Sequence, residues 1–181
     1  IALSGYAGYL SDRYGKRSII VLCKLAEVVI VLLGMCGFVL GSLPVLLGVL
    51  FLMGVHSAFF GPSKYGILPE LVPEGHLPAA NGVFLMTTFI AIITGTVGAG
   101  FLKRYIDENI FLVGAAYVAV ATTGLATSLL IRKTPPVRPN LKFEWSDLFV
   151  SFDTLKMFWR DRPLLMALAM YTVFWFIGGI T

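Results

Sequence analysis

Long apolar runs, each ended by a short polar or Pro- and Gly-containing segment, dominate the pattern of the chain. A helix needs about 20 mainly apolar residues to cross the hydrocarbon core of a bilayer, and Gly and Pro mark where such helices stop. The runs therefore predict a series of membrane-spanning helices. The predicted spans are Ser18–Val39, Leu43–Phe60, Ala79–Phe101 and Ile110–Ile131, with a helix end at Ile1–Leu10 and a further start at Leu164.

The basic residues are concentrated in alternate connections between these spans. Segments 11–17, 61–78 and 132–163 hold eleven of the 14 Lys and Arg residues, whereas the opposite connections hold only Lys103 and Arg104. Cytoplasmic loops of membrane proteins carry an excess of Lys and Arg, so the first three segments are predicted to face the cytoplasm. The net charge of +4 is thus explained by topology. Since no RNA- or DNA-binding motif accompanies it, no nucleic-acid partner is expected.

The composition excludes a soluble globular domain. Hydrophobic residues make up 57% of the chain and charged residues 13%, against roughly 45–50% and 25% in soluble domains. The 19 glycines suit helices that approach one another closely in a membrane. Both ends of the chain lie inside apolar runs, so a fragment of a longer protein is expected. Cys23 and Cys36 lie about 20 Å apart along one predicted helix, too far to form a disulfide.

The segment 132–163 contains a pattern of its own. Aromatic and apolar residues recur there at helical spacing, with charged residues on the other side, which predicts an amphipathic helix. Two arrangements fit it, a helix lying on the inner leaflet surface or a linker helix packed on the base of the bundle. The apolar positions are Trp145, Leu148, Phe149, Phe152, Leu155 and Trp159.

A charged segment with two glycines precedes the first complete span, Gly8-Tyr9-Leu10-Ser11-Asp12-Arg13-Tyr14-Gly15-Lys16-Arg17. Its charges are costly unless they stay at the water interface, where Asp12 is expected to pair with a cation and the basic residues to face anionic headgroups. The pattern resembles G-x-x-x-D-R-x-G-x-R/K, the loop between helices 2 and 3 of major facilitator superfamily transporters. The resemblance implies a cytoplasmic conformational latch formed by Gly8, Asp12, Arg13, Gly15, Lys16 and Arg17.

The same resemblance implies an all-α polytopic bundle with the major facilitator fold. The chain would then run from the end of helix 2 to the start of helix 7. Residues 1–131 would form part of the N-terminal transmembrane half, residues 132–163 the cytoplasmic linker, and residues 164–181 the start of the C-terminal half.

A second stretch narrows the resemblance. Residues 59–73, FFGPSKYGILPELVP, are followed by Ala80-Asn81-Gly82. They resemble the helix 4–5 loop of bacterial lysophospholipid transporters and of related modules fused to phospholipid acyltransferases. Gly61-Pro62 is expected to end the preceding helix, and Pro69-Glu70 to start a short one. Lys64 and Tyr65 are expected at headgroup depth. Both a structural role and a role in admitting a lipid headgroup remain open for this loop, including Glu70 and Asn81.

Ionisable and hydroxyl residues inside the spans are the remaining candidates. Lys24 and Glu27 lie three positions apart on one helix face, within reach of an ion pair, and intramembrane charges usually face the bundle interior. An inert pair and a role in substrate or ion coupling are both compatible with this spacing. A hydrogen-bonded buried side chain is favoured over proton coupling for His56. Thr87 and Thr94 share a stripe of small residues that favours close helix packing, or lines a central cavity.

No motif for covalent chemistry or metal binding is present. The sequence has no G-x-S-x-G and no P-loop, and His76 is followed five positions later by Asn81 rather than Asp. No cofactor, no metal and no catalytic residue are expected. Three hypotheses follow: an alternating-access carrier of lysophospholipid or a similar amphipathic molecule in the bacterial inner membrane, a transporter module of an acyltransferase fusion, or a non-transporting receptor or anchor.

Overall fold

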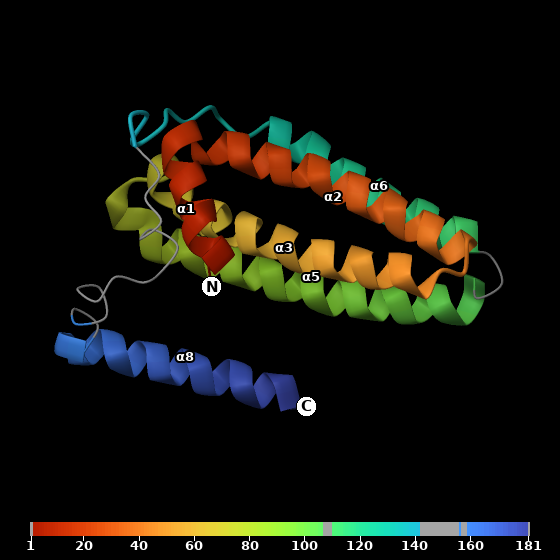
Figure 1. Cartoon of the computed structure of the whole chain (residues 1–181). Helices are drawn as coiled ribbons and strands as arrows, with labels where there is room; N and C mark the ends of the chain where they lie inside the picture. The colour runs from red at the N-terminus through yellow and green to blue at the C-terminus, as the bar shows by residue number, and fades with distance from the viewer. Residues whose placement is uncertain (1, 107–109, 142–155, 157–158, 181) are drawn as a thin grey trace.

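A computed structural model describes residues 2–106, 110–141, 156 and 159–180. Within these ranges the chain is built from helices joined by short connections (Figure 1). The elements, in chain order, are α1 (Ala2–Tyr14), α2 (Lys16–Val39), α3 (Leu43–Gly66), α4 (Leu68–Leu71), a 3-10 turn (Glu74–His76), α5 (Leu77–Ile106), α6 (Ile110–Leu129) and α8 (Arg162–Ile180).

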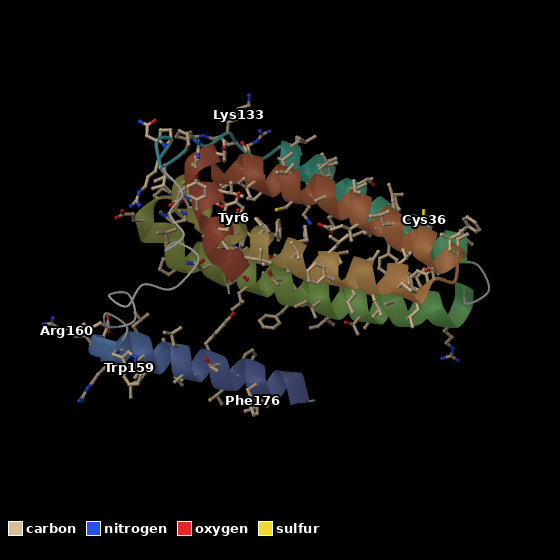
Figure 2. All side chains as sticks on the ribbon, viewed as in Figure 1. Tyr6, Cys36, Lys133, Trp159, Arg160 and Phe176 are labelled. Atoms are coloured by element: carbon tan, nitrogen blue, oxygen red, sulfur yellow. The ribbon has the colours of Figure 1, made fainter. Side chains whose placement is uncertain are left out.

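α2, α3, α5 and α6 lie side by side in one elongated bundle, and α8 lies outside it (Figure 1). α2 packs along both α3 and α6, and α1 packs on α3. Figure 1 shows the α1–α2 corner, the α3–α5 connection and the chain after α6 at one end of this bundle, and the α2–α3 connection at the other. We call the first of these the basic end, because its connections contain most of the Lys and Arg residues. In Figure 2, Lys133 lies at the basic end and Cys36 near the opposite end.

Four helical segments are long and apolar enough to cross a membrane, among the residues that the structure describes. They are Lys16–Val39, Leu43–Leu71, Glu74–Leu102 and Phe111–Leu129. Large apolar side chains such as Leu50, Phe51 and Val120 are exposed along them. An exposed apolar surface of this extent suits a lipid solvent and not water. The all-α polytopic bundle predicted from the sequence is therefore confirmed.

The buried core is small and lies mainly at the basic end. It includes Tyr9 of α1, Ile20 and Cys23 of α2, and Ile67 with Leu68 before α5. These residues pack where α1 crosses α3, which holds the corner between α1 and α2 in place. The opposite end is closed by a turn at Gly41 (φ +60°), whose N–H donates to Phe38 O at 3.1 Å, while Ser42 N–H donates to Gly37 O at 3.0 Å. This pattern ends a helix at a glycine in the left-handed region.

Two predicted boundaries are wrong. α1 continues to Tyr14 instead of ending at Leu10, so the charged segment 8–17 is a helical corner with one non-helical residue, Gly15 (φ +85°). α3 runs through Gly61-Pro62 to Gly66. Proline removes one helical hydrogen bond, yet the helix continues past it to Ser63, which is fully buried and contacts Ser11 of α1. The short helix predicted at Pro69-Glu70 is confirmed as α4.

The remaining boundaries shift by a few residues. α5 begins at Leu77 and ends at Ile106, longer than Ala79–Phe101, and α6 ends at Leu129 instead of Ile131. α8 spans Arg162–Ile180, close to the predicted start at Leu164. The amphipathic helix predicted around Trp145–Trp159 lies almost wholly outside the described residues. Of its apolar positions the structure describes Trp159, which is exposed (Figure 2).

Candidate functional site

The α1–α2 corner holds most of the predicted latch residues. Lys16, the first residue of α2, lies between two carboxylates: its Nζ is 3.7 Å from Asp12 Oδ1 and forms an ion pair and hydrogen bond with Glu70 Oε1 of α4. Lys16 and Glu70 are both largely shielded from solvent. The expected pairing of Asp12 with a cation is confirmed, and the corner is thereby joined to α4.

Arg17 joins the same corner to α6. Its guanidinium donates from Nε to Ile131 O at 2.7 Å and from Nη2 to Leu129 O at 2.9 Å. The last carbonyls of a helix lack partners and carry partial negative charge, so a cation there is favourable. Lys16 and Arg17 thus bind protein acceptors, and the expectation that they face anionic headgroups stays a prediction.

The chain after α6 continues across the corner. We call residues 130–141 the strap. Its Arg138 N–H donates to Asp12 O at 2.9 Å. A Cβ built on Gly15 would lie 3.0 Å from Thr134 O of the strap. The positive φ of Gly15 and this close approach both require glycine. The strap and the α1–α2 corner therefore fit against each other without room for a side chain.

Two other latch residues lie on α1 itself. Arg13 donates from Nη1 to the Tyr9 hydroxyl and lies over the rings of Tyr9 and Tyr14, with centroids 5.9 and 5.3 Å from Cζ. Gly8 is helical, and nothing lies within 4 Å of the Cβ it lacks. Gly8 therefore faces open space on the described part of the molecule.

A buried hydroxyl pair crosses between α1 and α3. Ser11 Oγ and Ser63 Oγ are 2.6 Å apart, and both residues are buried. A hydroxyl removed from water must find a partner, so the pair satisfies two polar groups at once. Sequence reasoning missed this contact, although Ser63 lies inside the stretch 59–73 that it singled out.

Inside the predicted membrane region, three ionisable side chains meet. Lys24 Nζ lies 2.7 Å from Glu27 Oε2, which confirms the predicted ion pair, and His56 Nε2 of α3 lies 3.7 Å from the same carboxylate oxygen. The Phe60 ring stacks on His56 (centroids 5.7 Å apart) and receives the Lys24 ammonium at 4.9 Å. His56 Nε2 is buried and has no hydrogen-bond partner in the described part of the chain. His56 does hydrogen-bond to the backbone of Cys23, so the hydrogen-bonded histidine that we expected is confirmed in part.

Lys64, near the end of α3, points toward α5. Its Nζ donates to Thr88 Oγ1 at 2.9 Å and lies 5.7 Å from the Phe84 ring centroid and 5.4 Å from that of Tyr65. Lys64 borders two adjoining hollows. One, of about 480 Å³, lies among α2, α3, α5 and α6 and also includes Lys24 and Phe60. The other, of about 430 Å³, follows α5 past Thr87 to Ile92.

The other predicted residues are exposed, and only Tyr65, beside Lys64, and Thr87 lie near these clusters in the described part of the chain. Tyr65 and Asn81 are exposed on their helices. Thr87 and Thr94 donate their hydroxyls to carbonyls of α5, at 2.9 Å (Thr87 to Val83 O) and 2.8 Å (Thr94 to Ile90 O). Thr87 lines the smaller hollow. Sequence reasoning missed Phe60, Phe84 and Thr88, because nothing in the local pattern links them to Lys64.

Metal binding finds no support where the structure describes the chain. No three His, Cys, Asp or Glu side chains gather there in an arrangement that holds a metal ion. Cys23 is buried and Cys36 exposed, and both are free.

The apolar spans, and the charged corner that joins them at one end, define a polytopic helical membrane protein. The chain matches the model of the Major Facilitator Superfamily over residues 1–181, and it belongs to this family.

Curated relatives are similar along almost the whole chain. The lysophospholipid transporter LplT of Pectobacterium carotovorum is 30% identical, covering 98% of this chain and 42% of the relative. The lysophospholipid transporter LplT of Photorhabdus laumondii is also 30% identical, covering 98% of this chain and 43% of the relative. That of Enterobacter sp. is 27% identical, and it also covers 98% of this chain and 43% of the relative. The chain thus spans about two fifths of the length of these relatives. No solved structure matches it.

Proposed function

We propose that this chain is part of a carrier that moves lysophospholipids across the bacterial inner membrane by alternating access. The family supports transport, and the relatives named above, all bacterial, are named for lysophospholipid transport. In this proposal residues 1–131 belong to one transmembrane half, 132–163 link the halves, and the basic end faces the cytoplasm. The relatives' names mention no acyltransferase, so the fused enzyme stays a prediction from the sequence.

The observation that carries the proposal is the cluster of Lys24, Glu27 and His56. Charges inside a membrane span are costly and mark substrate or ion pathways when they are kept. A lysophospholipid such as lysophosphatidylethanolamine is zwitterionic, so it offers an anion to Lys24 and a cation to Glu27. Exchange of the protein ion pair for two pairs with the headgroup would keep every charge compensated along the path. His56 lies at ion-pair distance from Glu27, so its contact with the carboxylate would change when Glu27 exchanges Lys24 for the lipid cation.

The test is uptake of labelled lysophosphatidylethanolamine into proteoliposomes that contain the full-length protein. The variants are Glu27→Gln and, as a matched control, Glu74→Gln, which makes the same change at an exposed carboxylate on the α4–α5 connection. We expect saturable uptake by the wild type and by Glu74→Gln, and at least a tenfold loss for Glu27→Gln. Full uptake by Glu27→Gln would reduce this carboxylate to a structural role. No uptake by the wild type would refute the lysophospholipid assignment.

A further inference from the structure

Lys64 differs from the other two lysines whose charges lie within the bundle. Lys16 has Asp12 and Glu70, and Lys24 has Glu27, as ion-pair partners. For Lys64, no carboxylate lies within 4.0 Å in the described part of the chain; its recorded hydrogen-bond partner is the neutral Thr88 hydroxyl. A half-buried ammonium loses hydration, and an anion nearby offsets this cost. A neutral hydroxyl offsets only part of it.

The surroundings of Lys64 suit an amphipathic ligand. The ammonium stands at the junction of the two hollows, with Phe84 bordering both. Apolar groups from Ile20, Phe60 and Leu71 line the larger hollow. Its volume, about 480 Å³, falls within the roughly 300–1,000 Å³ of small-molecule sites. A site with one cation that lacks an ion-pair partner among the described residues, and with mostly apolar walls, matches a molecule with one anionic group and one apolar chain.

Charge balance indicates which lysine would receive the anion. Lys24 also borders the larger hollow, but its charge is compensated at 2.7 Å by Glu27. Lys64 has no such compensation in the described residues. Thr88 holds the Lys64 Nζ in place, so part of the cost of ordering a long side chain is already met.

We propose that Lys64 binds the phosphate of a single-chain phospholipid, with the acyl chain lying against Phe60 and Phe84. This rests on the proposed function and adds to it a headgroup site at the basic end, separate from the Lys24–Glu27 pair. The occupant is a lipid and not free phosphate, because the walls of the hollow are mostly apolar and lie among membrane-spanning helices. The phosphate accepts hydrogen bonds from the Lys64 ammonium, and the lipid's own cation stays toward the aqueous end.

Binding to the full-length protein in detergent tests the site with three probes. Lysophosphatidylethanolamine has both groups, glycerophosphoethanolamine has the headgroup alone, and monoacylglycerol has the chain alone. We expect Lys64→Gln to weaken lysophosphatidylethanolamine at least tenfold, Lys64→Arg less than threefold, and Lys133→Gln, an exposed lysine of the strap, not at all. Monoacylglycerol should bind weakly and equally to wild type and Lys64→Gln.

A second measurement uses the wild type and needs no variant to fold. Acetylation of each lysine by a water-soluble ester is followed by mass spectrometry. We expect lysophosphatidylethanolamine, but not monoacylglycerol, to slow acetylation of Lys64 at least threefold while Lys133 reacts at an unchanged rate. Equal rates at Lys64 with and without lysophosphatidylethanolamine would overturn the proposal.

The remaining outcomes separate this inference from the proposed function. Uptake by the wild type with unchanged affinity in Lys64→Gln refutes the Lys64 site and leaves the transport function intact. Tight binding of glycerophosphoethanolamine would mean that the site takes a free phosphodiester, contrary to the lipid proposal. Loss of stability in Lys64→Gln without a change in affinity would assign Lys64 to an ion pair within the protein and also refute the site. Absence of uptake and binding in the wild type refutes both.

Discussion

Replacing Gly15 with alanine should destabilise the protein through two separate effects. A residue with a Cβ at φ +85° occupies a region that costs about 1–3 kcal/mol for anything but glycine. The added methyl would also lie 3.0 Å from Thr134 O, a backbone atom that cannot rotate away. Moving it would disturb the strap, whose Arg138 N–H bonds to Asp12 O. Together we expect a loss of about 2–3 kcal/mol in the free energy of unfolding.

Gly8→Ala is the matched control, since it makes the same chemical change in the same charged segment. Gly8 is helical, and nothing lies within 4 Å of its missing Cβ. Alanine in place of a helical glycine is worth about 0.5–1 kcal/mol, here as a gain. The two variants should therefore move stability in opposite directions.

The assay is thermal unfolding of the full-length variants in one detergent at equal concentration, followed by tryptophan fluorescence. With about 2–4 °C per kcal/mol for a domain of this size, Gly15→Ala should lower the apparent Tm by about 4–12 °C. Gly8→Ala should leave it unchanged or raise it by up to about 4 °C. This account of the corner would be refuted if Gly15→Ala were as stable as the wild type. It would also be refuted if Gly8→Ala were less stable than Gly15→Ala.

Three further predictions concern the same end of the molecule. Asp12→Asn should slow lysophospholipid uptake several-fold, whereas the protein should still insert at normal abundance. The partly exposed pair of Asp12 with Lys16 is worth at most about 1 kcal/mol of stability. A full transport rate in this variant would contradict the latch. Arg17→Met should release the start of the strap from α2 and speed limited proteolysis near residues 130–141 at least threefold, measured by mass spectrometry, whereas the exposed Arg132→Met should not. Equal cleavage in both variants would show that the guanidinium does not hold the strap. The topology can be tested in a variant with Cys23 and Cys36 replaced by alanine. In this background Ser42→Cys should react with a membrane-impermeant maleimide added outside the inner membrane, and Lys133→Cys should not. The reverse pattern would invert the proposed topology.

The parts that the sequence predicted correctly depend on local periodicity. The spans follow from runs of apolar residues, and the Lys24–Glu27 pair follows from a spacing of three on a helix face. The short helix at Pro69-Glu70 likewise follows from residues with strong local preferences.

The parts that it could not predict depend on pairs far apart in the chain. Ser11 meets Ser63 across 52 positions, Lys16 meets Glu70 across 54, and Arg17 meets Ile131 across 114. Nothing in the local pattern distinguishes a basic residue that faces headgroups from one that binds a distant carbonyl. The same limit applies around Pro62, because the contact that Ser63 makes with Ser11 of α1 also joins residues far apart in the chain.

The contacts of the α1–α2 corner also have a mechanical consequence. Ser11 fixes α1 to α3, Lys16 fixes α2 to α4, and Arg17 fixes α2 to the end of α6. Polar contacts of this kind resist sliding, since a shift of one residue would leave a charge or hydroxyl without its partner. We therefore expect these helix ends to move as one rigid body, and the strap, bonded to Asp12, to move with them.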